Sequence, residues 1–121
     1  MAWKKGSKFH NVKTRVNGRV CDSRKEGRRY KELLLLQNAG EIHDLQCQVE
    51  YELIPPQRFR DPVTRRWRTM RGTKYIADFT YYDRDNRLVV EDVKSDATRT
   101  PEYKIKRKLM YWLNNILIKE T

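Results

Sequence analysis

Two aspartates and a lysine have the types and the spacing that favour chemistry, because they fall on two stretches typical of neighbouring strands. The stretches are 75–82 (YIADFTYY) and 87–94 (RLVVEDVK), separated by the turn-forming residues 83–86 (DRDN). Their β-branched and aromatic residues predict an antiparallel hairpin. Side chains alternate between the two faces of a strand. If the turn closes over the last three of its residues, Asp78 lies directly opposite Asp92 on one face, and Lys94 follows on that face.

This arrangement has an electrostatic cost. The two carboxylates would be about 5 Å apart at Cβ, and like charges directly opposite each other destabilise a sheet. A divalent cation between them removes the repulsion, and ligation by oxygen atoms alone suits Mg²⁺. Lys94 adds a positive group beside the pair. Glu91 alternates to the other face, and we therefore expect it to be dispensable for chemistry.

A helix before the hairpin places a third acid. Residues 23–26 (SRKE) form a capping box, and the helix should run to about Ala39, where Gly40 closes it. Glu26 stands four residues before Tyr30 and heads the apolar stripe of this helix, where a purely solvating glutamate is out of place. Two compatible interpretations follow: a capping glutamate, or an acid that reaches the cation site.

Residues 42–54 alternate apolar and polar side chains, which predicts a strand with one buried face that Pro55-Pro56 ends. Gln48 lies on its polar face, where we favour a surface amide over a residue that orients water at the site.

A second helix should begin at Thr100 and Pro101 and end at Asn114-Asn115, before a last short strand at 116–118. Its expected apolar side is Ile105, Leu109, Trp112, Leu113 and Ile116. The element order α, β, β, β, α, β predicts a mixed sheet flanked by helices.

Composition bounds the class of protein. We expect the 121 residues to form one domain, 1–121, with one modest core. The net charge of +11 indicates a polyanionic partner, nucleic acid before an anionic membrane. No apolar run approaches the roughly 20 residues that span a bilayer, and residues 1–5 lack the apolar core of a signal peptide, so we expect an intracellular protein with no membrane partner. The two cysteines and two histidines have no zinc-ligand spacing.

Three basic segments are candidate DNA contacts. Residues 1–20 form a basic arm, for which DNA contact and a solvated tail fit the sequence equally well. In residues 57–72, a projecting loop or hairpin, arginines alternate with aromatic residues that can stack on exposed bases, so we favour DNA contact there. The second helix carries a basic stripe. The candidate residues are Lys4, Lys5, Lys8, Lys13, Arg58, Arg60, Arg65, Arg66, Trp67, Arg68, Arg71, Lys104, Arg107 and Lys108.

The acids and the lysine also carry a resemblance. A lone Asp78, followed on the next strand by Asp92-Val93-Lys94, resembles the pattern of the PD-(D/E)XK nucleases, with Ala77 where the family name has Pro. Several motifs in order resemble the phage-encoded, archaeal-like Holliday-junction resolvases of that superfamily, from about Phe9 onward. These motifs are 22–26 (DSRKE), 28–30 (RRY), 51–54 (YELI), 75–79 (YIADF) and 90–94 (VEDVK).

The resemblance implies a restriction-endonuclease-like α/β fold and a Mg²⁺-dependent endonuclease, with Mn²⁺ able to substitute. Such an enzyme, a homodimer acting in DNA recombination and repair, would resolve four-way junctions in branched double-stranded DNA by paired symmetric cuts. Asp78, Asp92 and the Val93 carbonyl would hold the ion, Lys94 would orient or deprotonate the attacking water, and Glu26 would complete the acidic cluster through a second ion or through water. A phage-encoded chain would act in the cytoplasm of an infected bacterial host.

Two alternatives stay open. One is a basic nucleic-acid-binding module without catalysis, which predicts DNA binding but no cleavage with Mg²⁺ or Mn²⁺. The other is a nuclease of the same fold that acts on flaps or other DNA.

Overall fold

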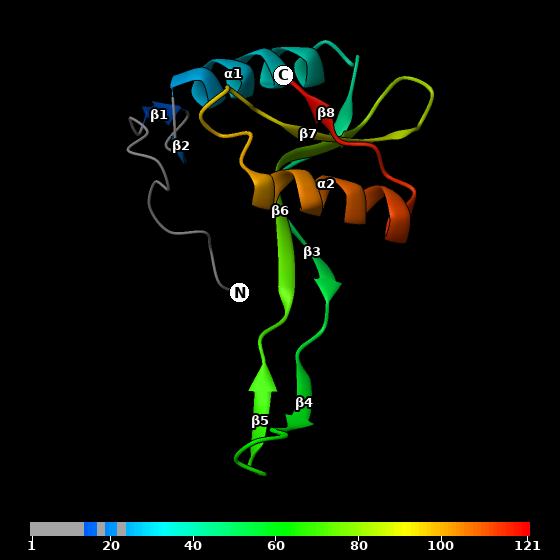
Figure 1. The fold of residues 1–121 in the computed structure, drawn as a ribbon. Helices are drawn as coiled ribbons and strands as arrows, with labels where there is room; N and C mark the ends of the chain where they lie inside the picture. The colour runs from blue at the N-terminus through cyan, green and yellow to red at the C-terminus, as the bar shows by residue number, and fades with distance from the viewer. Residues whose placement is uncertain (1–13, 17–18, 22–23) are drawn as a thin grey trace.

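The structure, a computed structural model, describes residues 14–16, 19–21 and 24–121 (Figure 1). Its elements, in chain order, are β1 (Thr14–Val16), β2 (Arg19–Cys21), α1 (Arg24–Asn38), β3 (His43–Ile54), β4 (Gln57–Arg60), β5 (Trp67–Met70), β6 (Thr73–Tyr82), β7 (Leu88–Asp92), α2 (Pro101–Asn114) and β8 (Lys119–Glu120). The predicted basic arm lies outside the described residues except for β1 and β2, which pair with each other.

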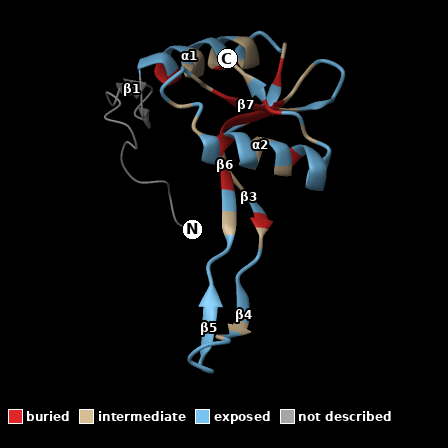
Figure 2. Cartoon of the chain, in the orientation of Figure 1, coloured by how far each residue is buried: buried red, intermediate tan, exposed pale blue. Residues whose placement is uncertain are grey.

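A mixed four-stranded sheet with the order β3-β6-β7-β8 forms the body of the molecule. The first three strands are antiparallel, and β8 runs parallel to β7. Each helix packs on its own cluster of buried residues. Leu33 of α1 packs with Phe79 and Tyr81, whereas Tyr103 and Met110 of α2 pack with Tyr75, Ala77 and Val90 (Figure 2). The predicted class, α/β with a mixed sheet and two helices, is confirmed.

The hairpin that carries the two aspartates closes as the sequence predicts. The Asp83 N–H donates to the Arg87 carbonyl, and the Asp83 carboxylate accepts hydrogen bonds from the backbone N–H groups of Asp85 and Arg87. Asn86 takes a left-handed conformation with φ of 58°, which asparagine tolerates well. This turn fixes the register of β6 against β7, and with it the position of the acids.

The helix ends also follow the sequence. Gly40 has φ of 79° and ends the first helix, where the Glu41 N–H bonds the Leu36 carbonyl. Thr100 caps α2 by accepting the Tyr103 N–H at 3.2 Å, and Asn115 ends it with φ of 56°. Ser23, the predicted cap of α1, lies outside the described residues.

The predicted apolar side of α2 faces the core only in part: Leu109 and Ile116 pack on the buried cluster, and the other three residues do not. Ile105, Trp112 and Leu113 are exposed, and the fully buried residues are Tyr103 and Met110, seven positions apart. The Tyr103 hydroxyl donates to Glu120 at 2.7 Å, so this contact helps to set the rotation of the helix. The last strand also differs: 116–118 only lead to β8, which pairs Lys119 with Glu91 and Glu120 with Asp92.

Residues 57–72 form a hairpin that projects from the body (Figure 1). Strands β4 and β5 pair from Gln57↔Met70 to Arg60↔Trp67, and nearly every residue in them is exposed (Figure 2). At the base of the hairpin its two backbone segments approach so closely that a Cβ on Gly72 would lie 2.7 Å from the Ile54 carbonyl oxygen. Only glycine fits there without a backbone shift.

Candidate active site

The two aspartates lie together where strands β6 and β7 part. The ladder runs from Tyr82↔Leu88 to Phe79↔Glu91, so the next position sets Asp78 opposite Asp92. There a side chain replaces the backbone carbonyl as the acceptor: the Asp78 Oδ2 accepts a hydrogen bond from the Val93 N–H at 2.9 Å. Both side chains are buried, with 6% and 4% of their surface exposed. The hairpin therefore places the acids as the sequence predicts, at a split in the sheet.

The direction of the Val93 carbonyl follows from the hydrogen bonds of its two neighbours. The Asp92 carbonyl accepts from the Thr121 N–H, and the Lys94 N–H donates to the Thr121 carbonyl, both on the β8 side. Backbone groups of successive residues in an extended chain point to opposite edges. The Val93 carbonyl, like the Val93 N–H, therefore faces Asp78, as the assignment of Val93 as a ligand requires.

Lys94 lies beside the pair. Its Nζ is 3.4 Å from Asp92 Oδ2 and 3.9 Å from the centre of the Tyr103 ring, a cation–π contact that uses the face of the aromatic ring. The Tyr75 hydroxyl donates to the same Asp92 oxygen at 2.7 Å. Lysine and tyrosine together hold one side of Asp92. Sequence reasoning missed both tyrosines, because no local motif links either of them to the acids.

Glu26 and Gln48 complete the cluster. The Gln48 Nε2 lies 3.4 Å from Glu26 Oε2 and 3.5 Å from Asp78 Oδ1, so the amide stands between the two acids. The expectation of a surface amide is wrong: Gln48 is buried because the register of β3 against β6, unshifted from Gln46↔Thr80 to Val49↔Ala77, sets it opposite Asp78. This pairing joins segments that lie far apart in the sequence, and the pattern of β3 alone does not show it.

Burial and repulsion make the charged form of Asp92 costly. Burial, and then the neighbouring Asp78 carboxylate, raise the pKa of Asp92 to about 8, against the opposing effects of Lys94 and Tyr75. Burial raises the pKa of Tyr75 as well, and the Asp92 charge adds to the effect. A proton on Asp92, or a cation in its place, relieves the conflict.

The donor set fits a hard cation. Two carboxylates, the Val93 carbonyl and the Gln48 Oε1, a buried oxygen without a hydrogen-bond partner among the described residues, are all oxygen ligands of the kind that Mg²⁺ takes. Among the described residues, however, no three His, Cys, Asp or Glu side chains group closely enough for a metal cluster. The amide of Gln48 separates Glu26 from Asp78, so Glu26 belongs to the outer part of the site.

Glu91, next to Asp92 in sequence, has a different environment. It is fully buried and accepts two hydrogen bonds from Arg29 of α1, at 2.8 and 2.6 Å, and a third from the Tyr81 hydroxyl. Burial works to raise the pKa of Glu91, but these hydrogen bonds outweigh it and the pKa is lowered. Glu91 thus ties the first helix to the sheet, and strand alternation sets it on the face opposite to its neighbour Asp92.

The basic candidates fall in three places. Lys4, Lys5, Lys8 and Lys13 lie outside the described residues. The candidates of the 57–72 hairpin are exposed along it, whereas on α2 Lys104 and Lys108 are exposed and Arg107 is half-buried, 3.5 Å from Glu120. No helix in the described part of the chain is long and apolar enough to cross a membrane.

A family model described as "Protein of unknown function (DUF1064)" matches residues 6–117. The chain has no match among the curated proteins or among the solved structures.

Proposed function

Because the chain belongs to the DUF1064 family, whose description assigns no activity, we propose a function from the site: a metal-dependent endonuclease that hydrolyses phosphodiester bonds in branched DNA. One observation carries the proposal. Two buried carboxylates face each other at the split of β6 and β7, with an ammonium 3.4 Å from one of them. Such a pair is costly to a fold and useful to a hydrolase.

The finer fold belongs to the same proposal. Without the projecting hairpin and the β1–β2 pair, the element order is α1, β3, β6, β7, α2, β8, the order expected of a restriction-endonuclease-like domain. The acids lie on the central strands β6 and β7. Both features support the likeness to phage-encoded Holliday-junction resolvases.

Each residue of the cluster then has a role. Asp78, Asp92 and the Val93 carbonyl would hold Mg²⁺ or Mn²⁺, with Glu26 acting through water or a second ion. The bound ion would neutralise charge on the phosphate and stabilise the departing O3′. Lys94 would orient the attacking water or take its proton. Its contacts with Asp92 and Tyr103 hold the ammonium beside the two aspartates. Tyr75 and Gln48 position the two aspartates.

The substrate is polyanionic and branched in this proposal. The chain carries a net charge of +11, and its exposed hairpin offers arginines together with Trp67, a combination suited to phosphates and unstacked bases. The exposed arginines and lysines of the hairpin and of α2 suit contacts with phosphates, which favours recognition of DNA shape over sequence.

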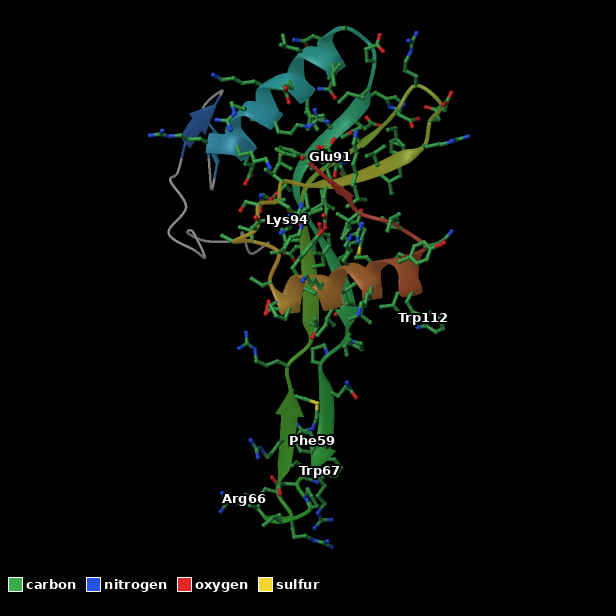
Figure 3. All side chains as sticks on the ribbon, turned by 45° about the horizontal axis from the view of Figure 1, so that its top comes forward. Phe59, Arg66, Trp67, Glu91, Lys94 and Trp112 are labelled. Carbon is green, nitrogen blue, oxygen red and sulfur yellow. The ribbon has the colours of Figure 1, made fainter. Side chains whose placement is uncertain are left out.

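Paired cuts need two sites, and the apolar face of α2 offers a surface for a second copy. Ile105, Leu113 and Trp112, the last 83% exposed, lie on it, and Trp112 points away from the body (Figure 3). If two α2 helices packed antiparallel about an axis near residue 108, Ile105 of each copy would meet Trp112 of the other. This contact is self-complementary, as a two-fold dimer requires.

The test is cleavage of a labelled four-way junction by the purified full-length protein, with Mg²⁺ or with EDTA, beside flap, duplex and single-stranded substrates. We expect metal-dependent, paired symmetric cuts in the junction. Asp78→Asn should abolish cleavage and keep junction binding, while the control Asp85→Asn in the exposed turn should cut at the wild-type rate. Binding without cleavage in any metal would instead support a non-catalytic module, and preferred cutting of flaps would change the substrate but not the chemistry.

A further inference from the structure

The projecting hairpin ends in a turn that its own hydrogen bonds hold in one shape. Asp61 organises it: its carboxylate Oδ1 accepts the N–H groups of Val63 and Thr64, at 2.8 and 3.1 Å, and its Oδ2 accepts from Arg68 at 3.0 Å. Its backbone N–H donates to the Arg66 carbonyl at 2.8 Å. These bonds lower the pKa of Asp61, and they leave the turn with a fixed conformation rather than a floppy tip.

This turn presents two apolar residues beside Thr64 and Arg65. Pro62 and Val63 stand at its outer end, and Val63, at 86%, is the most exposed large hydrophobic side chain in the described part of the chain. Arg65 lies in the same turn and is exposed, and Arg66 and Trp67 follow it near the end of the hairpin in Figure 3. Phosphate contact alone would not need an exposed valine beside this charge.

Both faces of the hairpin carry arginine. Arg60 pairs with Trp67 on one face, where Arg58 also lies with its guanidinium 5.7 Å from the Trp67 ring centre. Arg68 lies on the other face, opposite Phe59, and there it is ion-paired with Asp61. A ribbon lying flat on DNA would need arginine on one face alone, whereas a ribbon inside a groove has a phosphate backbone on each side.

The reach is sufficient for a groove. Four paired residues rise about 13 Å at roughly 3.3 Å per residue, before the turn is added, whereas the grooves of B-DNA are about 7.5 to 8.5 Å deep. The tight approach of Gly72 to Ile54 anchors the base of the hairpin on the long β3–β6 ladder.

We propose that this hairpin enters a DNA groove and that Val63, led by Pro62, wedges between base pairs at the branch point, where stacking is already broken. The inference rests on the proposed function for its partner, DNA, and goes beyond it in naming the contact. Apolar side chains inserted at a base step kink DNA at the cost of unstacking, which is least where a step is already open. The arginines at the tip and behind it then hold the flanking phosphates.

The experiment uses the full-length protein in EDTA, so that DNA is bound but not cut, with a four-way junction that carries 2-aminopurine at the branch point. Wild-type protein should raise the 2-aminopurine fluorescence on binding, because the base loses its stacking neighbour. Val63→Ser should lose most of this rise and weaken binding by about fivefold to tenfold, the loss expected when the apolar part of one valine side chain is no longer buried. Val63→Ile should retain the rise, and Leu35→Ser, at another exposed apolar residue, on α1, should change neither quantity.

Two outcomes would overturn the wedge. One is an equal fluorescence rise with Val63→Ser. The other is no rise although the wild-type protein is bound, a result also expected if Val63 contacts a protein partner instead of DNA. Each leaves the nuclease proposal standing if Mg²⁺ still supports cleavage. Conversely, a Val63-dependent rise without cleavage in Mg²⁺ or Mn²⁺ supports the wedge and removes the nuclease. No binding to any DNA would overturn both.

Discussion

Replacing Asp92 with asparagine in metal-free protein should change how stability depends on pH. In the folded protein, burial and Asp78 raise the pKa of Asp92 to about 8, against an ordinary value of 3.8. The folded state therefore holds its proton more tightly than the unfolded state. The stability that this proton provides is fully present below about pH 4 and is lost as the pH rises towards 8.

The shift also bounds the size of the effect. At about 1.4 kcal/mol per pKa unit, Asp92 contributes at most roughly 6 kcal/mol of pH-dependent unfolding free energy. Because asparagine does not titrate, Asp92→Asn should lack this component and have a flatter profile between pH 4 and 8. It can still accept the Tyr75 hydroxyl that Asp92 accepts at 2.7 Å.

The assay is urea unfolding in EDTA from pH 4 to 9, followed by circular dichroism, for wild type, Asp92→Asn and the exposed-turn control Asp85→Asn. Added Mg²⁺ should restore stability to the wild type at pH 8 and leave Asp92→Asn unchanged, since a ligand that binds only the folded state stabilises it. Parallel profiles for wild type and Asp92→Asn would refute the electrostatic account of the site.

Three further predictions use other parts of the molecule. Glu91→Gln should lower the free energy of unfolding by about 3 kcal/mol, because Arg29 then keeps a half-buried charge without a carboxylate partner. Urea unfolding midpoints measure this loss, and a loss below experimental error would contradict the prediction. Arg65→Gln with Arg66→Gln should reduce the slope of log K against log salt by about 2 in junction binding, and an unchanged slope would exclude phosphate contacts at the tip. Trp112→Ser should convert a dimer to a monomer in sedimentation experiments without loss of fold, and a wild-type protein that is monomeric on junction DNA would remove the α2 interface.

The hairpin and the helix ends were predictable because their signals are local. The turn at 83–86 and the capping of α2 by Thr100, Pro101 and Asn115 depend on residues within a few positions of each other. Since side-chain direction then follows from the strand period, the opposition of Asp78 and Asp92 followed from the register alone.

The misread features depend on contacts between distant segments. Gln48 reaches the site because the pairing of β3 with β6 sets it opposite Asp78, a residue 30 positions away in the sequence. The rotation of α2 is set in part by the hydroxyl of Tyr103 on Glu120, seventeen positions away, and so its exposed Trp112 read as core. Helical spacing identifies an apolar face but does not say whether the chain itself covers that face.

Two adjacent acids on β7 show how the fold treats a charge that it needs only for structure. Glu91 is fully buried, yet Arg29 and Tyr81 give it hydrogen bonds, and its pKa is lowered. Asp92, one residue on and similarly buried, faces another carboxylate and has a raised pKa. Because an apolar residue at either aspartate position would avoid the repulsion, local stability does not explain why both are acidic. Binding a cation does explain it, and this contrast within one strand is the strongest physical reason to test the protein as a nuclease.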